Sequence, residues 1–219
     1  MTDFLLEEAL RYLGAARADE ATRRAVAETA QTLRGTISPR FVYRVFDLEK
    51  KGGAPFLPDA GLTLPGNMAK TMLQSCGQAA LLCCTLGAEF ERLLRMTQAR
   101  DMAKAAILNA CGSAYAEAGC DKAEKEIASR YPGMYLTDRF SPGYGDLPLT
   151  LQPDFIAALD AGRRLGVTVT DSLLMLPAKT VTAVIGLSES PQPARIRSCG
   201  FCALKENCAY RERGTHCGI

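Results

Sequence analysis

The spacing of apolar residues predicts two helices at the start of the chain. Over residues 4–13, apolar side chains recur three and four positions apart, and Gly14 follows as a stop signal. The same period recurs over residues 19–33, where Arg and Glu fill the positions between, and Gly35 ends the run. A short helix is therefore expected first, followed by a longer amphipathic one.

The next part of the chain alternates between strand-like and turn-like composition. Residues 40–46 are β-branched and aromatic, which predicts a strand, and residues 52–58 contain two glycines and two prolines, which predict a loop. Residues 67–75 have a helical pattern. The continuous apolar run over residues 79–85 is typical of a strand that is buried on both faces.

An Ala-rich stretch from residue 88 to residue 130 predicts two helices, with a break near residues 98–100 and the second helix the longer. Gly112 and Gly119 lie inside that second helix, where glycine is unfavourable, so close packing against a neighbour or a ligand is expected at both positions. Four cysteines in apolar surroundings are expected to pack as small core residues: Cys83, Cys84, Cys111 and Cys120.

Residues 139–148 hold too many prolines and glycines for regular structure, so an irregular loop is expected there. A helix over residues 153–164 and strands over 167–170 and 180–186 complete the pattern. Helices and strands are intermixed without a strict βαβ alternation. These elements predict an α+β fold with helices packed on a mostly antiparallel sheet.

The chain is expected to contain a single domain over residues 1–187. A Ser- and Pro-rich linker over residues 188–198 follows, and residues 199–219 form a short C-terminal cysteine-rich tail. This tail is too short to build a hydrophobic core of its own.

Composition excludes several functional classes. The 219 residues are 47% apolar and 23% charged with a net charge of +2, which argues against disorder, a collagen-like fibre and a strongly basic nucleic-acid binder. No apolar run is long enough to span a bilayer, and the N-terminus lacks the features of a signal peptide. A cytoplasmic protein with no nucleic-acid or membrane partner is expected.

The tail carries the strongest local signal for chemistry. Four cysteines follow the spacing Cys-x2-Cys-x5-Cys-x8-Cys: Cys199, Cys202, Cys208 and Cys217. Four converging thiolates suit either a zinc ion or an iron–sulfur cluster, and the spacing does not choose between them. The alternative is a set of thiols that bind no metal.

The irregular loop is a second candidate site. Gly143 and Gly145 allow the backbone to approach a ligand closely, and the guanidinium of Arg139 presents a fixed fork for a carboxylate. The alternative is a surface turn in which Tyr144 covers a hydrophobic patch.

Three segments occur in the order seen in one known family. The loop RFSPGYG begins at Arg139, a later segment, LGVTVTDSLLMLP, begins at Leu165, and an upstream helical segment, AYAEA, begins at Ala114. Together they resemble the Arg-Pro-Ala-x-Gly-Tyr loop, the Gly-Val-x-Leu-Thr-Glu-x-x-Ala-Met-x-Pro segment and the Leu-Ala-Glu-Ala helix of the activation domain of cobalamin-dependent methionine synthase. The resemblance is good over residues 105–186 and looser before that, so residues 1–63 match only loosely.

The resemblance implies a domain that binds S-adenosylmethionine and supports the reductive remethylation of cob(II)alamin. It implies that Arg139 holds the carboxylate of the ligand and that Glu117 holds its amino group. Backbone near Ser141 and Gly143 is implied to line the site, and Tyr144 to face the corrin. A guanidinium and a carboxylate are suitable partners for a zwitterionic amino acid.

The sequence departs from the family in two respects. It carries no methyltransferase or cobalamin-binding module, so the implied partner is a separate cobalamin-binding methionine synthase or related corrinoid methyltransferase chain. After Tyr144 the family reads Pro-Ala-Cys-Pro with a nearby histidine, whereas this chain reads Gly145-Asp146-Leu147-Pro148 and its one histidine is His216.

The leading hypothesis is therefore a reactivation partner that supplies S-adenosylmethionine to a cobalamin held by another chain. An iron–sulfur cluster in the tail would add the electron that reactivation needs. Two alternatives stay open: a non-enzymatic corrinoid-protein interaction module with a zinc clip, and an independent iron–sulfur electron carrier. None of these readings assigns a catalytic acid, base or nucleophile to the chain, so whether it is itself an enzyme also stays open.

Overall fold

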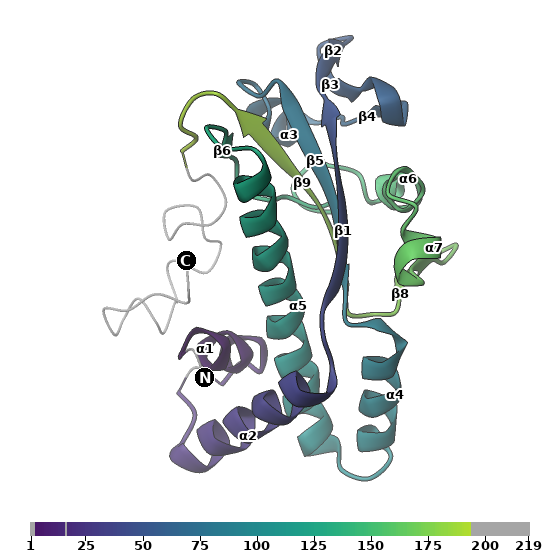
Figure 1. The fold of residues 1–219 in the computed structure, drawn as a ribbon. Helices are drawn as coiled ribbons and strands as arrows, with labels where there is room; N and C mark the ends of the chain where they lie inside the picture. Colours follow the sequence, from purple (N-terminus) through teal and green to yellow (C-terminus); the bar gives the residue numbers. More distant parts are fainter. Residues whose placement is uncertain (1–2, 16, 194–219) are drawn as a thin grey trace.

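The computed structural model describes residues 3–15 and 17–193 (Figure 1). Its centre is an antiparallel sheet in the order β1-β5-β9-β6. The strands are β1 (Arg40–Asp47), β5 (Gln78–Thr85), β9 (Thr180–Ser188) and β6 (Tyr135–Leu136). Every strand pairing in the described part of the chain is antiparallel, and β5 pairs along its whole length with both β1 and β9. The expected α+β class with an antiparallel sheet is confirmed.

Both faces of β5 are covered, which explains the uninterrupted apolar run over residues 79–84. Ala80, Leu82 and Cys84 pack with residues of the long helix α5 (Met102–Arg130). Successive side chains in a strand point to opposite faces, so Leu81 and Cys83 lie on the other side. There they pack with α3 (Asn67–Met72), α6 (Gln152–Ala158) and α7 (Ala161–Leu165).

The remaining helices form a second layer around the first half of α5 (Figure 1). They are α1 (Asp3–Tyr12), α2 (Glu20–Thr36) and α4 (Gly87–Gln98). Asp19 caps α2, because its carboxylate accepts a hydrogen bond from the backbone N–H of Thr22 at 2.8 Å. None of the helices in residues 3–15 and 17–193 combines the length and apolarity that a bilayer crossing requires.

The two glycines inside α5 are sites of close approach. A Cβ atom added to Gly112 would lie 2.2 Å from Cζ of Phe90 on α4. One added to Gly119 would lie 2.6 Å from Sγ of Cys84 on β5 and 2.7 Å from Cβ of Pro39. The expected close packing is confirmed, and in both cases the neighbour is the protein itself. Gly119 thus brings the backbone of α5 directly against the sheet.

The burial of the four cysteines that were expected in the core agrees with the sequence prediction. At most 1% of Cys83, Cys84, Cys111 and Cys120 is exposed. Burial raises the pKa of Cys83 to about 12 and that of Cys111 to about 11, because a thiolate is unfavourable in apolar surroundings. These two thiols are therefore protonated core groups at neutral pH.

Two predictions about secondary structure are wrong. The segment 52–58 is not simply a loop, because β2 (Glu49–Lys51) and β3 (Ala54–Leu57) pair as a hairpin extended by β4 (Leu62–Thr63). Gly52 and Gly53, at φ 59° and 78°, form its two-residue turn. The helix expected over 153–164 is split into α6 and α7 at Asp160, which has a left-handed backbone with φ 50°.

Several boundaries also differ from the predicted ones. Helix α3 ends at Met72 rather than at residue 75, and the strand expected over 167–170 is reduced to β7 (Thr168–Val169). That strand pairs with β8 (Met175–Leu176), and short 3₁₀ turns lie at Pro58–Ala60 and Leu149–Leu151. Strand β9 extends to Ser188, the first residue of the expected linker.

Candidate functional site

Arg139 is held against the main sheet by the residue that follows it. Phe140 forms an isolated β-bridge with Val184 of β9, and its backbone N–H donates to the carbonyl of Val184 at 3.0 Å. The reciprocal hydrogen bond measures 2.7 Å. Only 8% of the Arg139 side chain is exposed. The bridge therefore fixes the point from which Arg139 reaches α5.

Three carboxylates of α5 receive the guanidinium of Arg139. One terminal nitrogen, Nη1, donates to Oδ1 of Asp121 at 2.7 Å and also to Glu124, while the other, Nη2, donates to Glu117. Residues 117, 121 and 124 are separated by four and three positions, so they share one face of the helix. We call this set of four residues the Arg139 cluster.

Charges in the Arg139 cluster are unbalanced, with three acids facing one base. Burial is the main reason that the pKa of Glu124 rises to about 7, and the carboxylates of Asp121, Glu117 and Asp138 raise it further against the opposing effect of Arg139. Burial alone would lower the pKa of Arg139, but its acidic neighbours raise it above its ordinary value. The arginine is therefore charged at all relevant pH values, while Glu124 titrates near neutrality.

One aromatic side chain also lies near the Arg139 cluster. Tyr12, at the end of α1, is 41% exposed, and its pKa is raised by burial and by the charge of Glu117. The guanidinium of Arg11 stacks over its ring, 4.4 Å from the centroid. The sequence alone did not indicate which aromatic ring would lie near Glu117.

The irregular loop after Arg139 is held in place by its own backbone. The N–H of Gly143 donates to the carbonyl of Leu147 at 2.8 Å, and that of Tyr144 donates to the carbonyl of Ser141 at 3.0 Å. Gly143 has φ 89°, a left-handed conformation that favours glycine. Tyr144 is 47% exposed and is available to contact another molecule.

Asp146 attaches this loop to the N-terminus of α3. Its carboxylate accepts hydrogen bonds from the backbone N–H groups of Asn67 at 2.6 Å and Met68 at 2.9 Å. These bonds stabilise the ionised form and lower the pKa of Asp146. The residue that departs from the family pattern therefore has a structural task, which is to join the loop to a helix.

The structure brings two of the predicted ligand residues into direct contact, since Arg139 and Glu117 form an ion pair. Ser141, Gly143 and Tyr144 follow Arg139 in the same loop. Their roles toward a ligand stay predictions. Sequence reasoning missed Asp121 and Glu124, although their spacing from Glu117 on a predicted helix was a signal that they share its face.

The predicted metal ligands, Cys199, Cys202, Cys208 and Cys217, all lie outside the described residues. Within residues 3–15 and 17–193, no group of three or more His, Cys, Asp or Glu side chains is arranged to hold a metal ion. The choice between zinc and an iron–sulfur cluster therefore stays open.

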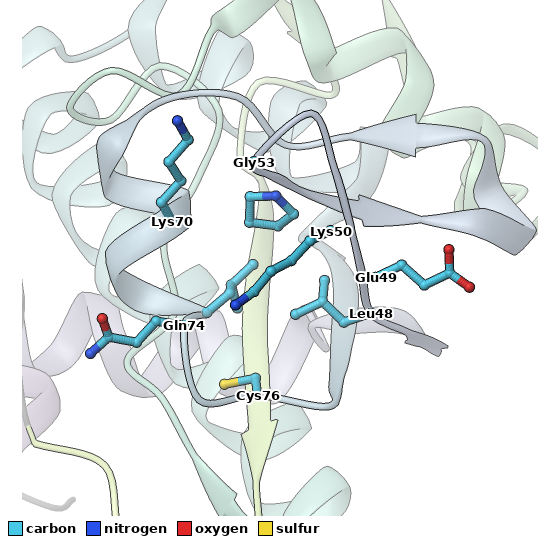
Figure 2. Close-up of a pocket in the computed structure, with 9 residues that line it drawn as sticks. Leu48, Glu49, Lys50, Gly53, Lys70, Gln74 and Cys76 are labelled. Carbon is cyan, nitrogen blue, oxygen red and sulfur yellow. The ribbon is translucent and has the colours of Figure 1, made fainter.

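A separate cavity of about 330 Å³ lies between the β2–β3 hairpin and α3 (Figure 2). It is lined by Leu48, Glu49, Lys50, Gly53, Pro55, Lys70, Leu73, Gln74 and Cys76. Figure 2 shows Lys50 reaching across the cavity toward Gln74, whereas Glu49 points away from it. None of the predicted ligand residues contributes to this lining.

Fold and site together describe a class of protein: an α+β domain with helices on both faces of an antiparallel sheet and a buried arginine that pairs with three carboxylates of one helix. No protein-family model matches the sequence, and no curated protein matches it. A solved structure does match, described as "Crystal Structure of the MetH Reactivation Domain bound to AdoHcy". It aligns with 90% of this chain and 74% of its own, with a TM-score of 0.58 and 15% identity. The chain therefore has the fold of the MetH reactivation domain, which confirms at the level of the fold the resemblance found in the sequence.

Proposed function

We propose that this chain reactivates a cobalamin-dependent methionine synthase or a related corrinoid methyltransferase carried on a separate chain. In this role it binds S-adenosylmethionine and supports the reductive remethylation of cob(II)alamin held by the partner. One observation carries the proposal: Arg139 and Glu117, which the family resemblance assigns to ligand binding, are in contact on the fold of the MetH reactivation domain.

The residues of the site have complementary tasks in this proposal. Arg139 orients the ligand carboxylate and Glu117 its amino group, because a zwitterion is held best by charges of opposite sign. Backbone groups near Ser141 and Gly143 line the ligand. Tyr144 is exposed, which suits a contact with the corrin of the partner.

Arg139 already donates to three carboxylates. A ligand carboxylate must therefore share the guanidinium with these acids or displace one of them. Glu124 is the acid most easily displaced, because its pKa of about 7 leaves it partly protonated at neutral pH. A protonated Glu124 no longer competes as an anion for the guanidinium.

The chemistry that this site serves is a methyl transfer after a one-electron reduction. A cobalamin held by the partner would, once reduced by one electron, accept the methyl group of the sulfonium, and the electron pair of the carbon–sulfur bond would stay on sulfur to give S-adenosylhomocysteine. We propose that an iron–sulfur cluster bound by the tail cysteines supplies the electron. The chain itself contributes binding and orientation rather than an acid or a base.

Calorimetric titration of the full chain with S-adenosylmethionine tests the ligand assignment. Arg139→Lys removes the planar fork but keeps the charge, and we expect it to weaken binding at least about tenfold, since one charge-assisted hydrogen bond contributes about 1.5–3 kcal/mol. Arg163→Lys is the matched control, because Arg163 lies on α7 and pairs with Asp160 just before that helix, outside the Arg139 cluster. Glu117→Gln gives a second variant if Arg139→Lys melts at a lower temperature.

Three results would contradict the proposed function or its ligand site. The first is a wild-type chain that does not bind S-adenosylmethionine. The second is a folded Arg139→Lys variant that binds it as tightly as the wild type while Glu117→Gln is also unaffected. Equal weakening by Arg163→Lys would likewise remove Arg139 from the ligand site.

A further inference from the structure

The cavity between the β2–β3 hairpin and α3 has the size and the lining of a small-molecule site. Its volume of about 330 Å³ lies in the range of roughly 300–1,000 Å³ that is common for ligand pockets. Pro55 and Leu73 form a buried apolar wall, and Leu48 is half-buried beside them. The partly exposed thiol of Cys76 completes this side. The cavity therefore has room and apolar surface for a compact organic group.

The hairpin presents a cation and no anion to this cavity. Lys50 of β2 lies directly opposite Pro55 of β3, so the two side chains share the face that lines the cavity. Successive side chains alternate, so Glu49 and Lys51 belong to the other face. There the ammonium of Lys51 lies 4.7 Å from the centroid of the Phe56 ring. Figure 2 likewise shows Glu49 directed away from the cavity and Lys50 reaching across it.

The opposite wall adds a second cation and an amide, from Lys70 on α3 and from Gln74 just after that helix. Within residues 3–15 and 17–193, neither Lys50 nor Lys70 takes part in an ion pair. The acid nearest in effect to Lys70 is Asp146, whose pKa is lowered first by backbone hydrogen bonds at the start of α3 and only then by the charge of Lys70. Both ammonium groups thus remain available to an anion from outside the chain.

We infer that this cavity binds a small organic anion, with its apolar body against Pro55 and Leu73 and its carboxylate or phosphate between Lys50 and Lys70. Burial of the apolar body supplies affinity, and the two ammonium groups select the sign of the charge. Flexible lysine stems allow both groups to close on one anion, to which the amide of Gln74 also donates. No residue assigned to S-adenosylmethionine lines the cavity, so this inference goes beyond the proposed function and does not depend on it.

Cys76 provides a reporter of occupancy, because its thiol lines the cavity. The test measures the rate at which iodoacetamide alkylates Cys76 in the full chain, read by mass spectrometry of the peptide that contains it, which separates it from the other cysteines. Phenyl phosphate and benzoate are the probes, and each should slow the alkylation in a saturable way. Inorganic phosphate lacks the apolar body and benzyl alcohol lacks the charge, so both should protect Cys76 much less at equal concentration.

Three variants locate the anion. Lys50→Met and Lys70→Met each remove one ammonium group, and each should raise the concentration for half-protection by about 3- to 10-fold, as expected for the loss of a partly exposed charge contact. Lys51→Met is the matched control, because it removes the same charge one position further along β2, on the face turned away from the cavity. Each variant is compared with its own alkylation rate without ligand, which cancels any direct effect of the lysine on the thiol.

The outcomes decide both the site and the ligand class. Stronger protection by phenyl phosphate assigns a phosphate head group, and stronger protection by benzoate assigns a carboxylate. The inference is overturned if neither anion protects Cys76, or if inorganic phosphate or benzyl alcohol protects it equally well. It is also overturned if Lys51→Met weakens protection as much as Lys50→Met, or if Lys50→Met and Lys70→Met both leave it unchanged. None of these results alters the proposed function, which is tested by the binding of S-adenosylmethionine.

Discussion

Glu124 should make the stability of the fold fall as the pH rises. Its pKa is about 7 in the folded chain and 4.5 in the ordinary state that an unfolded chain approaches. At about 1.36 kcal/mol for each pH unit, this difference corresponds to about 3 kcal/mol. Because 22% of the side chain remains exposed, solvent screening reduces the expected effect to about 2–3 kcal/mol.

The direction follows from proton binding. Below the unfolded pKa both states are protonated, and the stabilising contribution of Glu124 is fully present. Above that value the unfolded chain ionises first, while the folded chain still retains the proton. The contribution then declines and is lost as the pH passes the folded pKa of about 7.

Urea unfolding of the wild type and Glu124→Gln from about pH 5 to about pH 8 measures the contribution of Glu124 to the free energy of unfolding. Glutamine does not titrate, so the free energy of unfolding of the variant relative to wild type should rise by about 2–3 kcal/mol across this range. Glu126→Gln serves as the control on the same helix. A relative stability that stays flat or falls with pH would refute the assignment of a raised pKa to Glu124.

Three further predictions concern packing, the loop and the tail. Gly112→Ala should destabilise the fold by about 1–3 kcal/mol in urea unfolding, because the added methyl group meets the ring of Phe90, whereas Gly35→Ala meets nothing within 4 Å and should not destabilise it. Asp146→Asn should speed hydrogen exchange at the N-terminus of α3, because a neutral amide is a weaker acceptor for two backbone N–H groups. Anaerobically purified protein should contain iron and sulfide, and Cys202→Ala should lose them; zinc without iron would contradict the cluster.

The sequence predicted the helices and strands whose pattern of apolar and polar residues follows directly from which of their faces are buried. Residues 79–85 were recognisable as a strand because both faces of β5 are covered and every position from 79 to 84 is apolar. The sequence also predicted the break between α4 and α5. It did not predict the split at Asp160, because there a single residue with a left-handed backbone interrupts an otherwise helical pattern. The β2–β3 hairpin was missed because its glycines and prolines were interpreted as a loop.

The candidate site was predictable only in part, and for a different reason. Family resemblance pointed to Glu117 and Arg139, which lie 22 positions apart in sequence and meet in the fold. Periodicity places Asp121 and Glu124 on the same helix face as Glu117, but it does not reveal what that face meets. That information depends on where the bridge between Phe140 and Val184 places Arg139, which is a property of the tertiary structure.

The anchoring of Arg139 and of α5 has a consequence for the thermodynamics of ligand binding. Phe140 ties Arg139 to β9, and the close contact at Gly119 ties the acidic helix to β5, so both halves of the site rest on one hydrogen-bonded sheet. The backbone of such a site is preorganised: the segments that carry Arg139 and the acids are fixed before a ligand arrives, so little backbone entropy is lost on binding and the rearrangement is confined to side chains that exchange partners. Most of the ordering on binding must then come from the ligand itself.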